Sequence, residues 1–195
     1  RFARGELVAA AIHLHAVEGA SIDANVEAVR GDSAFHDAVL VAFARREQGL
    51  LVAEGNPRKL ATIADLAATR VRVATRPKGA GAQLLLEALL ARAGQGIEAI
   101  EAVAPPCPTG PDVAQAIRAG RADCGIATRS VANASGLGFV PLQWEVFDLV
   151  IRQRCYFRPP VQALVSFLRS PALVARAGEL GGYDVAEAGR VRYAP

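Results

Sequence analysis

The fold is decided by the sequence VRVATRPKGAGAQLLLEALLARA, which spans Val71 to Ala93. It predicts a short β-branched strand, a loop with two glycines, and an apolar helix that begins at Ala82 or Gln83. Such a helix start presents free backbone N–H groups and the positive end of the helix dipole, and glycines allow a ligand to approach closely. The segment therefore indicates a small-anion site, although many glycine-rich strand-to-helix turns are only turns.

A second strand-to-helix junction follows in IEAVAPPCPTGPDVAQAIRAGRADCGIA, from Ile100 to Ala127. Thr109 is the expected N-cap of its helix, Pro111 suits the first helical turn, and Gly120 ends the helix. The order strand, helix, strand, helix, strand predicts a parallel sheet, and such sheets bind ligands beyond the carboxyl ends of their strands. Two helix N-termini would then face one crevice.

The candidate ligand-binding residues come from these two junctions, together with Thr128. Arg76 would add positive charge to the site. The carboxylate of Asp112 would repel an anion unless it caps its own helix and points away from the crevice. The full candidate set is Thr75, Arg76, Gly79, Ala80, Gly81, Ala82, Gln83, Thr109, Gly110, Asp112 and Thr128.

The composition is that of an ordinary globular chain. With 195 residues, 52% hydrophobic and 21% charged, the chain can build one substantial core or two small lobes. Its net charge is +3, and its arginines are spread along the chain without a basic block, so nucleic-acid binding by this chain is not indicated. No apolar run approaches a membrane span and no signal peptide is visible. We expect a cytoplasmic domain, or a periplasmic one if a signal peptide lies upstream.

The cysteines and histidines do not indicate a redox or metal site. Cys107, Cys124 and Cys155 are an odd number without CxxC spacing, so neither disulfides nor structural zinc is expected. Cys107 is a candidate for an exposed thiol in the turn before the second helix, whereas Cys124 belongs to a core strand. His13 and His15 share one face of a strand, but two histidines do not complete a metal site. No catalytic constellation is recognisable, and we expect neither enzymatic activity nor a cofactor.

The remaining elements follow from hydrophobic periodicity and turn residues. Further helices are expected at residues 23–30, 62–68, 130–135, 160–169 and 171–179. Further strands are expected at residues 7–14, 38–44, 49–52, 138–142 and 146–151. The charged residues 45–48 are interpreted as a turn between two strand segments.

Five segments of the chain carry a family resemblance. They are AFARREQGLLVAEGNPRKLATIADLA, VRVATRPKGAGAQLLLEALL, AIRAGRADCGIA, GFVPLQWEVFDLVI and LGGYD. The most specific pieces are residues 46–50 followed by residues 55–57, and residues 119–123. These segments resemble the periplasmic-binding-protein-like domain of certain bacterial transcriptional regulators, which is often linked with molybdate or molybdopterin genes and is similar to LysR-type effector domains.

The resemblance implies an α/β, type II periplasmic-binding-protein-like fold with two lobes, parallel-type sheets and a ligand held between the lobes. The first lobe would comprise residues 1–52 and 146–195, and the second residues 53–145, with strands crossing at residues 47–52 and 144–148. Hinge closure around the ligand is the expected mechanism. The implied function is a ligand-sensing effector domain that binds a small anion such as molybdate and meets DNA only through a separate domain.

Two departures from the family pattern affect these expectations. The chain begins where the family's first lobe is already under way, so that lobe is expected to be truncated, either because the chain is a fragment or because it has lost part of the site. Relatives have Gly-Ser-Gly-Thr-Arg where residues 79–83 read Gly-Ala-Gly-Ala-Gln. Charge-assisted hydrogen bonds are roughly twice as strong as neutral ones, so a dianion such as molybdate would be held less tightly.

Two other functions remain open. A solute-binding protein of an ABC-type uptake system would use the same cleft for transport, and an upstream signal peptide would favour it, whereas an upstream helix-turn-helix would favour the regulator. A dimerisation module with a vestigial cleft is the third possibility. The uncovered edge and apolar face of a truncated lobe predict a homo-oligomer that uses the helices after Pro160.

Overall fold

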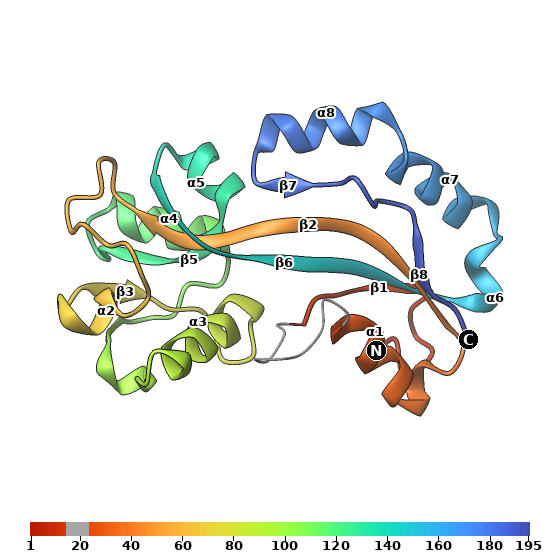
Figure 1. Cartoon of the computed structure of the whole chain (residues 1–195), viewed down its shortest axis with the longest axis horizontal. Helices are drawn as coiled ribbons and strands as arrows, with labels where there is room; N and C mark the ends of the chain where they lie inside the picture. Colours follow the sequence, from red (N-terminus) through yellow and green to blue (C-terminus); the bar gives the residue numbers. More distant parts are fainter. Residues whose placement is uncertain (15–23) are drawn as a thin grey trace. The chain divides into compact units, whose positions relative to one another are not determined.

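Two long strands, β2 (Ala38–Val52) and β6 (Gly138–Arg152), carry the architecture of this computed structural model (Figure 1). The structure describes residues 1–14 and 24–195. The chain forms two units: unit 1 comprises residues 1–46, 145–179 and 183–195, and unit 2 comprises residues 47–144 and 180–182. Because the boundaries fall inside β2 and β6, each long strand contributes to both units. The lobe boundaries expected from the resemblance, at residues 52 and 146, stay a prediction.

The continuity of β2 and β6 corrects the sequence interpretation. A turn was expected at residues 45–48, and β6 was expected as two strands, yet each is a single strand of 15 residues. Charged side chains of residues 45–48 form ion pairs with residues that are distant in the sequence. Within unit 1, Arg46 pairs with Glu145, and within unit 2, Glu47 pairs with Arg129. Since these ion pairs satisfy the charged side chains, the strand can continue through them.

Unit 2 contains the parallel sheet that the alternating pattern predicts. Its strand order is β6-β2-β5-β3-β4; β3 pairs in parallel with β4 and β5, and β5 pairs antiparallel with the end of β2. The remaining elements of unit 2 are α2 (Asp65–Ala68), β3 (Arg72–Ala74), α3 (Gly81–Arg92), β4 (Glu101–Val103), α4 (Gly110–Arg118), β5 (Cys124–Thr128) and α5 (Arg129–Ser135).

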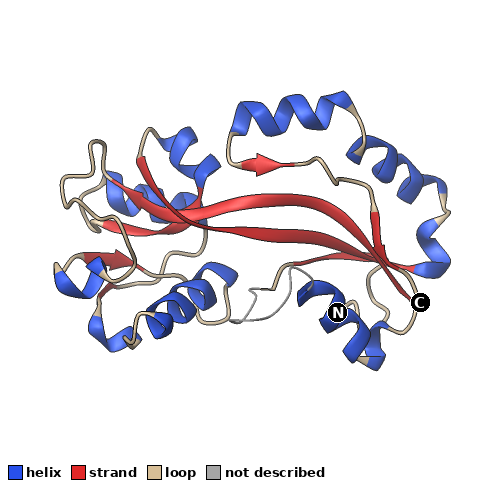
Figure 2. Cartoon of the chain, viewed as in Figure 1, coloured by secondary structure: helices blue, strands red, loops and turns tan. Residues whose placement is uncertain are grey.

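The helices of unit 2 cover both faces of this sheet (Figure 2). Leu66 of α2 and Leu86 of α3 belong to one buried cluster with Val73. Val113 of α4 and Ala132 of α5 belong to a second cluster on the other face. Such burial of both faces is typical of a parallel sheet, and it leaves the strand ends as the accessible part.

Local sequence signals explain most helix ends in unit 2. Thr109 is the N-cap of α4, as predicted, and Gly120 follows the helix with φ of 67°, a conformation that favours glycine. Helix α3 begins at Gly81, one residue before the expected start. Helix α2 is shorter than expected because the carboxylate of Asp65 accepts hydrogen bonds from the N–H groups of Ala61 and Thr62, which therefore precede the helix.

Unit 1 is built on antiparallel pairs. Strand β1 pairs with β6 from Ala9↔Ile151 to Ile12↔Asp148, and β7 and β8 both pair with β2. Among the described residues, parallel pairing is therefore confined to unit 2, although parallel-type sheets were expected in both lobes. The remaining elements of unit 1 are β1 (Ala9–Ile12), α1 (Ala24–Gly31), α6 (Gln153–Tyr156), α7 (Pro159–Leu168), α8 (Pro171–Leu180, whose last residue belongs to unit 2), β7 (Tyr183–Asp184) and β8 (Val191–Tyr193).

The helices of the described chain are short. Within residues 1–14 and 24–195, none is long and apolar enough to cross a membrane.

Candidate anion-binding site

The carboxyl ends of the parallel strands of unit 2 lie at one edge of the sheet. Strands β3 and β5 run side by side with Ala74 opposite Gly125, so Thr75 and Thr128 leave the sheet in the same direction. A Cβ on Gly125 would lie 2.7 Å from the carbonyl oxygen of Ala74, so glycine is needed for this close approach. Helices α3, α4 and α5 begin after β3, β4 and β5, which is the arrangement in which parallel sheets bind ligands.

Two hydrogen bonds join the two junctions that the sequence singled out, and a third lies within the first junction. The N–H of Cys107 donates to the carbonyl of Thr75 at 2.8 Å. The N–H of Arg76 donates to Oε1 of Gln83 at 3.0 Å, and Nη2 of Arg76 donates to the carbonyl of Pro108 at 2.6 Å. The structure thus brings the loop after β3, the start of α3 and the loop before α4 together.

The guanidinium of Arg76 is only partly satisfied by the protein. Its Nη2 is held by Pro108, but its Nε is buried and has no hydrogen-bond partner within the described residues. A buried donor without a partner costs about 1–3 kcal/mol, and such an atom is often explained by a ligand or water. Arg76 is therefore the strongest candidate for a charged contact with an anion.

The N-terminus of α3 lacks a side-chain cap. The N-cap residue is Ala80, which has no polar side chain, and the first turn contains no acidic residue. The N–H groups of Gln83 and Leu84 donate to the carbonyl of Ala80, whereas that of Ala82 has no partner among the residues described. Gly79, with φ of 84°, adopts the left-handed conformation that leads into this turn. The helix dipole is therefore not neutralised by the protein at this end.

The side chain of Gln83 is buried and stabilises the loop between β3 and α3. Its side chain is only 6% exposed. Oε1 accepts the N–H of Arg76, and Nε2 donates to Oε1 of Glu87 at 2.9 Å. Both ends of the amide are thus used within the protein, so Gln83 positions Arg76.

The N-terminus of α4 is occupied by its own cap. Oδ2 of Asp112 accepts the backbone N–H of Thr109 at 2.8 Å and its hydroxyl at 2.5 Å, which closes a capping box. Pro111 has no N–H to offer. Gly110 lies against the side chains of Ala127 and Val131. The carboxylate of Asp112 therefore caps its own helix, and α4 offers less to an anion than α3 does.

Thr128 lies at the end of β5, where its hydroxyl is 2.8 Å from that of Ser130. These hydroxyls are half-buried at the same edge as Thr75. They are neutral groups that can either donate or accept, so they can adapt to the charge of a ligand.

Cys107, Cys124 and His13 take structural positions. Cys107 is buried, which contradicts the expectation of an exposed thiol, and burial raises the pKa of this thiol. Burial also raises the pKa of Cys124 to about 12, as suits a core strand residue. Nδ1 of His13 lies 2.8 Å from Oε1 of Glu145, whereas His15 lies outside the described residues. In residues 1–14 and 24–195, no group of three or more His, Cys, Asp or Glu side chains could hold a metal ion.

Sequence reasoning did not identify the ion pairs that accompany this site. In unit 2, Nη2 of Arg129, the first residue of α5, donates to Glu47 at 3.1 Å, and its guanidinium lies 4.4 Å from the ring centre of Phe139. The carbonyl of Gly182 accepts the N–H of Glu47 in the same unit. The only sequence signal was the presence of Glu47 and Gly182 in the segments that carry the family resemblance.

The fold and the position of the strand ends define a type II periplasmic-binding-protein-like domain. Residues 1–169 match the family model described as PBP superfamily domain, and the chain belongs to this family. The resemblance inferred from sequence is thereby confirmed at the level of the superfamily.

Two relatives are similar in sequence. The uncharacterized protein YvgK of Bacillus subtilis (strain 168) is 28% identical over 152 residues, which cover 78% of this chain and 49% of YvgK. The chain thus spans about half the length of that relative. An uncharacterized protein encoded in the ferredoxin 2Fe-2S gene 5′ region of Clostridium pasteurianum is 30% identical over 80 residues, which cover 40% of this chain and 71% of that protein.

Solved structures share the fold. The Synechocystis PCC6803 CcmR regulatory domain in complex with 2-PG has a TM-score of 0.60 and 13% identity, covering 86% of this chain and 74% of that one. PEB3 of Campylobacter jejuni with L-phospholactate bound has a TM-score of 0.57 and 17% identity, covering 80% and 74%. The periplasmic aliphatic sulphonate binding protein SsuA of Escherichia coli has a TM-score of 0.54 and 19% identity, covering 91% and 60%.

Proposed function

We propose that this chain is a non-catalytic, ligand-sensing domain of a bacterial transcriptional regulator and that it binds a small oxyanion at the start of α3. One observation carries the proposal: the uncapped N-terminus of α3 follows directly on Arg76, whose buried Nε has no partner among the described residues. Helix N–H groups and a guanidinium are the donors that bind phosphate, sulfate and carboxylate groups. DNA contact and transcriptional control would belong to a separate domain, acting in the cytoplasm.

The donor set favours a weakly charged oxyanion over a compact dianion. One guanidinium and one helix end supply positive potential, while Asp112 places a carboxylate at the start of α4. Gln83, which stands where relatives have arginine, is already bonded to Arg76 and Glu87. We therefore expect molybdate to bind less tightly than a monoanionic sulphonate. One structural neighbour is named for an aliphatic sulphonate, which is a monoanion of this class. Another was solved with L-phospholactate, a phosphoester that also carries a carboxylate.

A solute-binding protein of an ABC-type uptake system is the second candidate. The similarity to SsuA favours it, just as the similarity to the CcmR regulatory domain favours the regulator. Both candidates use the same donor set. The coding sequence upstream of Arg1 separates them, because a helix-turn-helix would support the regulator and a signal peptide the uptake protein.

Calorimetry on the whole protein at low salt tests the proposal. The probes are sulfate, phosphate, molybdate and ethanesulphonate. Arg76→Gln is expected to weaken binding by on the order of tenfold, since a hydrogen bond to a charged group is lost. Arg118→Gln is the matched control, because Arg118 is exposed in the last turn of α4 of the same unit and its loss changes the net charge equally. Absence of oxyanion binding, or equal weakening by both variants, would contradict the proposal.

A further inference from the structure

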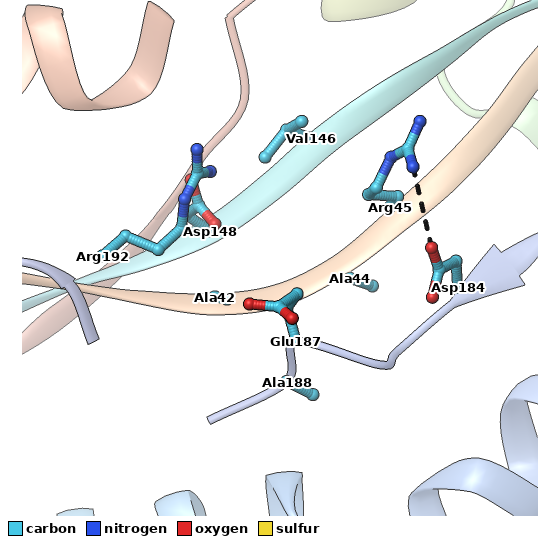
Figure 3. Close-up of a pocket in the computed structure, with 9 residues that line it drawn as sticks. All are labelled: Ala42, Ala44, Arg45, Val146, Asp148, Asp184, Glu187, Ala188 and Arg192. Atoms are coloured by element: carbon cyan, nitrogen blue, oxygen red, sulfur yellow. Dashed lines mark hydrogen bonds and ion pairs between the residues drawn. The ribbon is translucent and has the colours of Figure 1, made fainter. Parts of the chain in front are cut away.

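A cavity of about 210 Å³ lies within unit 1 (Figure 3). It is formed by β2, β6 and the segment that runs from β7 to β8. None of the eleven residues proposed for the oxyanion site lines it. The cavity is therefore a separate feature of the molecule.

Small side chains on β2 create this cavity. Leu40 packs with Val29 of α1 and Val150 of β6 in the core of unit 1. The next side chains on the same face of β2 belong to Ala42 and Ala44, which are too small to fill the equivalent space. The result is an apolar floor, to which Val146 and Ala188 also contribute.

The outer wall of the cavity is held in place by backbone hydrogen bonds. The N–H of Ala42 donates to the carbonyl of Arg190, and the N–H of Gly189 donates back to the carbonyl of Ala42, both at 2.8 Å. Nη2 of Arg169 donates to the carbonyl of Gly189 at 2.6 Å. A wall fixed in this way needs little reordering when a ligand enters, which lowers the entropic cost of binding.

The charged groups around the cavity fall into two kinds. Asp148 is fully buried, and its Oδ2 accepts hydrogen bonds from Arg192 at 2.6 Å and Asn25 at 2.9 Å. The Asp148–Arg192 ion pair is therefore part of the protein's own structure, and a ligand that broke it would leave a buried charge without a partner.

The other two carboxylates form ion pairs only with exposed side chains, and Asp184 also accepts the backbone N–H of Ala186 at 3.0 Å. Asp184 lies 3.7 Å from Arg45, and Glu187 pairs with Arg190, a residue that does not line the cavity. All four of these side chains are more than one third exposed. Exposed ion pairs contribute little free energy, so a cation that enters the cavity can replace them. Figure 3 shows Glu187 between the Asp148–Arg192 pair and the Arg45–Asp184 pair.

We propose that this cavity binds a small organic monocation, an alkylammonium ion with a short aliphatic chain. The ammonium group would lie at Asp184 and Glu187, and the chain would lie on the alanine floor. Three carboxylates against two guanidiniums give the lining an excess of one negative charge. At about 30 Å³ per water molecule, the cavity holds roughly seven waters, which matches a ligand of about five to seven non-hydrogen atoms. This ligand differs in charge and in location from the oxyanion proposed above.

Titration of the whole protein with n-butylammonium, followed by amide NMR, tests the proposal. We expect a Kd on the order of 1 mM, with shifts centred on the amides of Ala42 and Ala188. The double variant Asp184→Asn, Glu187→Gln keeps the cavity volume and is expected to weaken binding by on the order of tenfold. Ala44→Leu fills the cavity and should abolish binding.

The single variant Glu187→Gln removes one charge from the cavity, and Glu179→Gln is its matched control. Glu179 pairs with Arg176 three residues away, as Glu187 does with Arg190, but it does not line the cavity. Wild-type affinity in this control supports a local effect. The proposal is wrong if n-butylammonium does not bind the folded wild-type protein, if butyrate binds as well as n-butylammonium, or if Glu179→Gln weakens binding as much as Glu187→Gln does.

Discussion

Asp123 accepts three hydrogen bonds from Arg72. The backbone N–H of Arg72 donates to Oδ2 at 2.8 Å, Nε donates to the same oxygen at 3.2 Å, and Nη2 donates to Oδ1 at 3.1 Å. The pair joins the starts of β3 and β5, which run in parallel from there toward the candidate site. The side-chain hydrogen bond with Arg72 is the main reason that the pKa of Asp123 is lowered from 3.8 to about 2.

This pair predicts a defined loss of stability in acid. A carboxyl whose pKa is lower in the folded state stabilises the fold above its unfolded pKa, and this contribution disappears as the pH falls through the folded pKa. We expect Asp123→Asn to lower the free energy of unfolding by about 1–2 kcal/mol at neutral pH, allowing for solvent screening.

Urea unfolding at several pH values measures this effect. The difference between the wild type and Asp123→Asn should shrink between about pH 4 and pH 2, the window set by the two pKa values. Glu54→Gln, at an exposed position of the same unit, serves as the control and should change stability by no more than about 0.5 kcal/mol. A difference that stays constant down to pH 2 would show that the ion pair does not cause the loss.

Gly49 predicts a steric requirement inside unit 2. A Cβ at this position would lie 2.3 Å from the carbonyl oxygen of Val140 and 2.5 Å from the ring of Phe139. Gly49→Ala should therefore destabilise the protein by about 2 kcal/mol or more, because backbone of β6 would have to move. Gly178→Ala in α8 has no neighbour within 4 Å of the new Cβ and should be neutral or stabilising. Equal thermal unfolding temperatures for the two variants would contradict this account.

Local chemistry made α4 the most predictable element. Thr109, Pro111 and Gly120 act on residues within one helical turn of themselves, so cap, start and stop could all be predicted from sequence. The strand β2 shows the limit of such reasoning. Arg46 and Glu47 suggested a turn because their partners, Glu145 and Arg129, lie 99 and 82 residues away in the sequence.

The candidate site shows the same limit at the level of side chains. Topology alone brought Thr75 and Thr128 to one edge, because parallel strands end together. The direction of the Gln83 side chain was not predictable. It depends on the backbone path of Arg76, which places an N–H group within reach of the buried amide. The partnerless Nε of Arg76 likewise became evident only once burial was known.

Exposed aromatic and aliphatic side chains in unit 1 support the prediction of self-association. Phe157 is 82% exposed, Val174 60% and Phe167 49%, all within the helical region after β6. Several large exposed apolar side chains within one short stretch of the chain favour an interaction surface. We expect a homodimer, and we expect Phe157→Ser with Phe167→Ser to shift it toward the monomer. Sedimentation velocity measures this shift, and a wild-type protein that stays monomeric at high concentration would rule the dimer out.

Ala82 permits a direct test of the helix N-terminus in anion binding. Its N–H, at the second position of α3, has no partner in the described part of the chain, so a ligand is expected to use it. Ala82→Pro removes this donor and adds no charge. The helix should tolerate the change, because α4 begins with the same arrangement, Gly110 followed by Pro111. We expect stability to change by no more than about 1 kcal/mol, while oxyanion affinity falls by on the order of tenfold.

Leu84→Ala, at an exposed position of the same helix, is the control that should leave affinity unchanged. Unaltered oxyanion affinity in a folded Ala82→Pro variant would show that the N-terminus of α3 does not contact the anion, and would leave Arg76 as the donor to be tested.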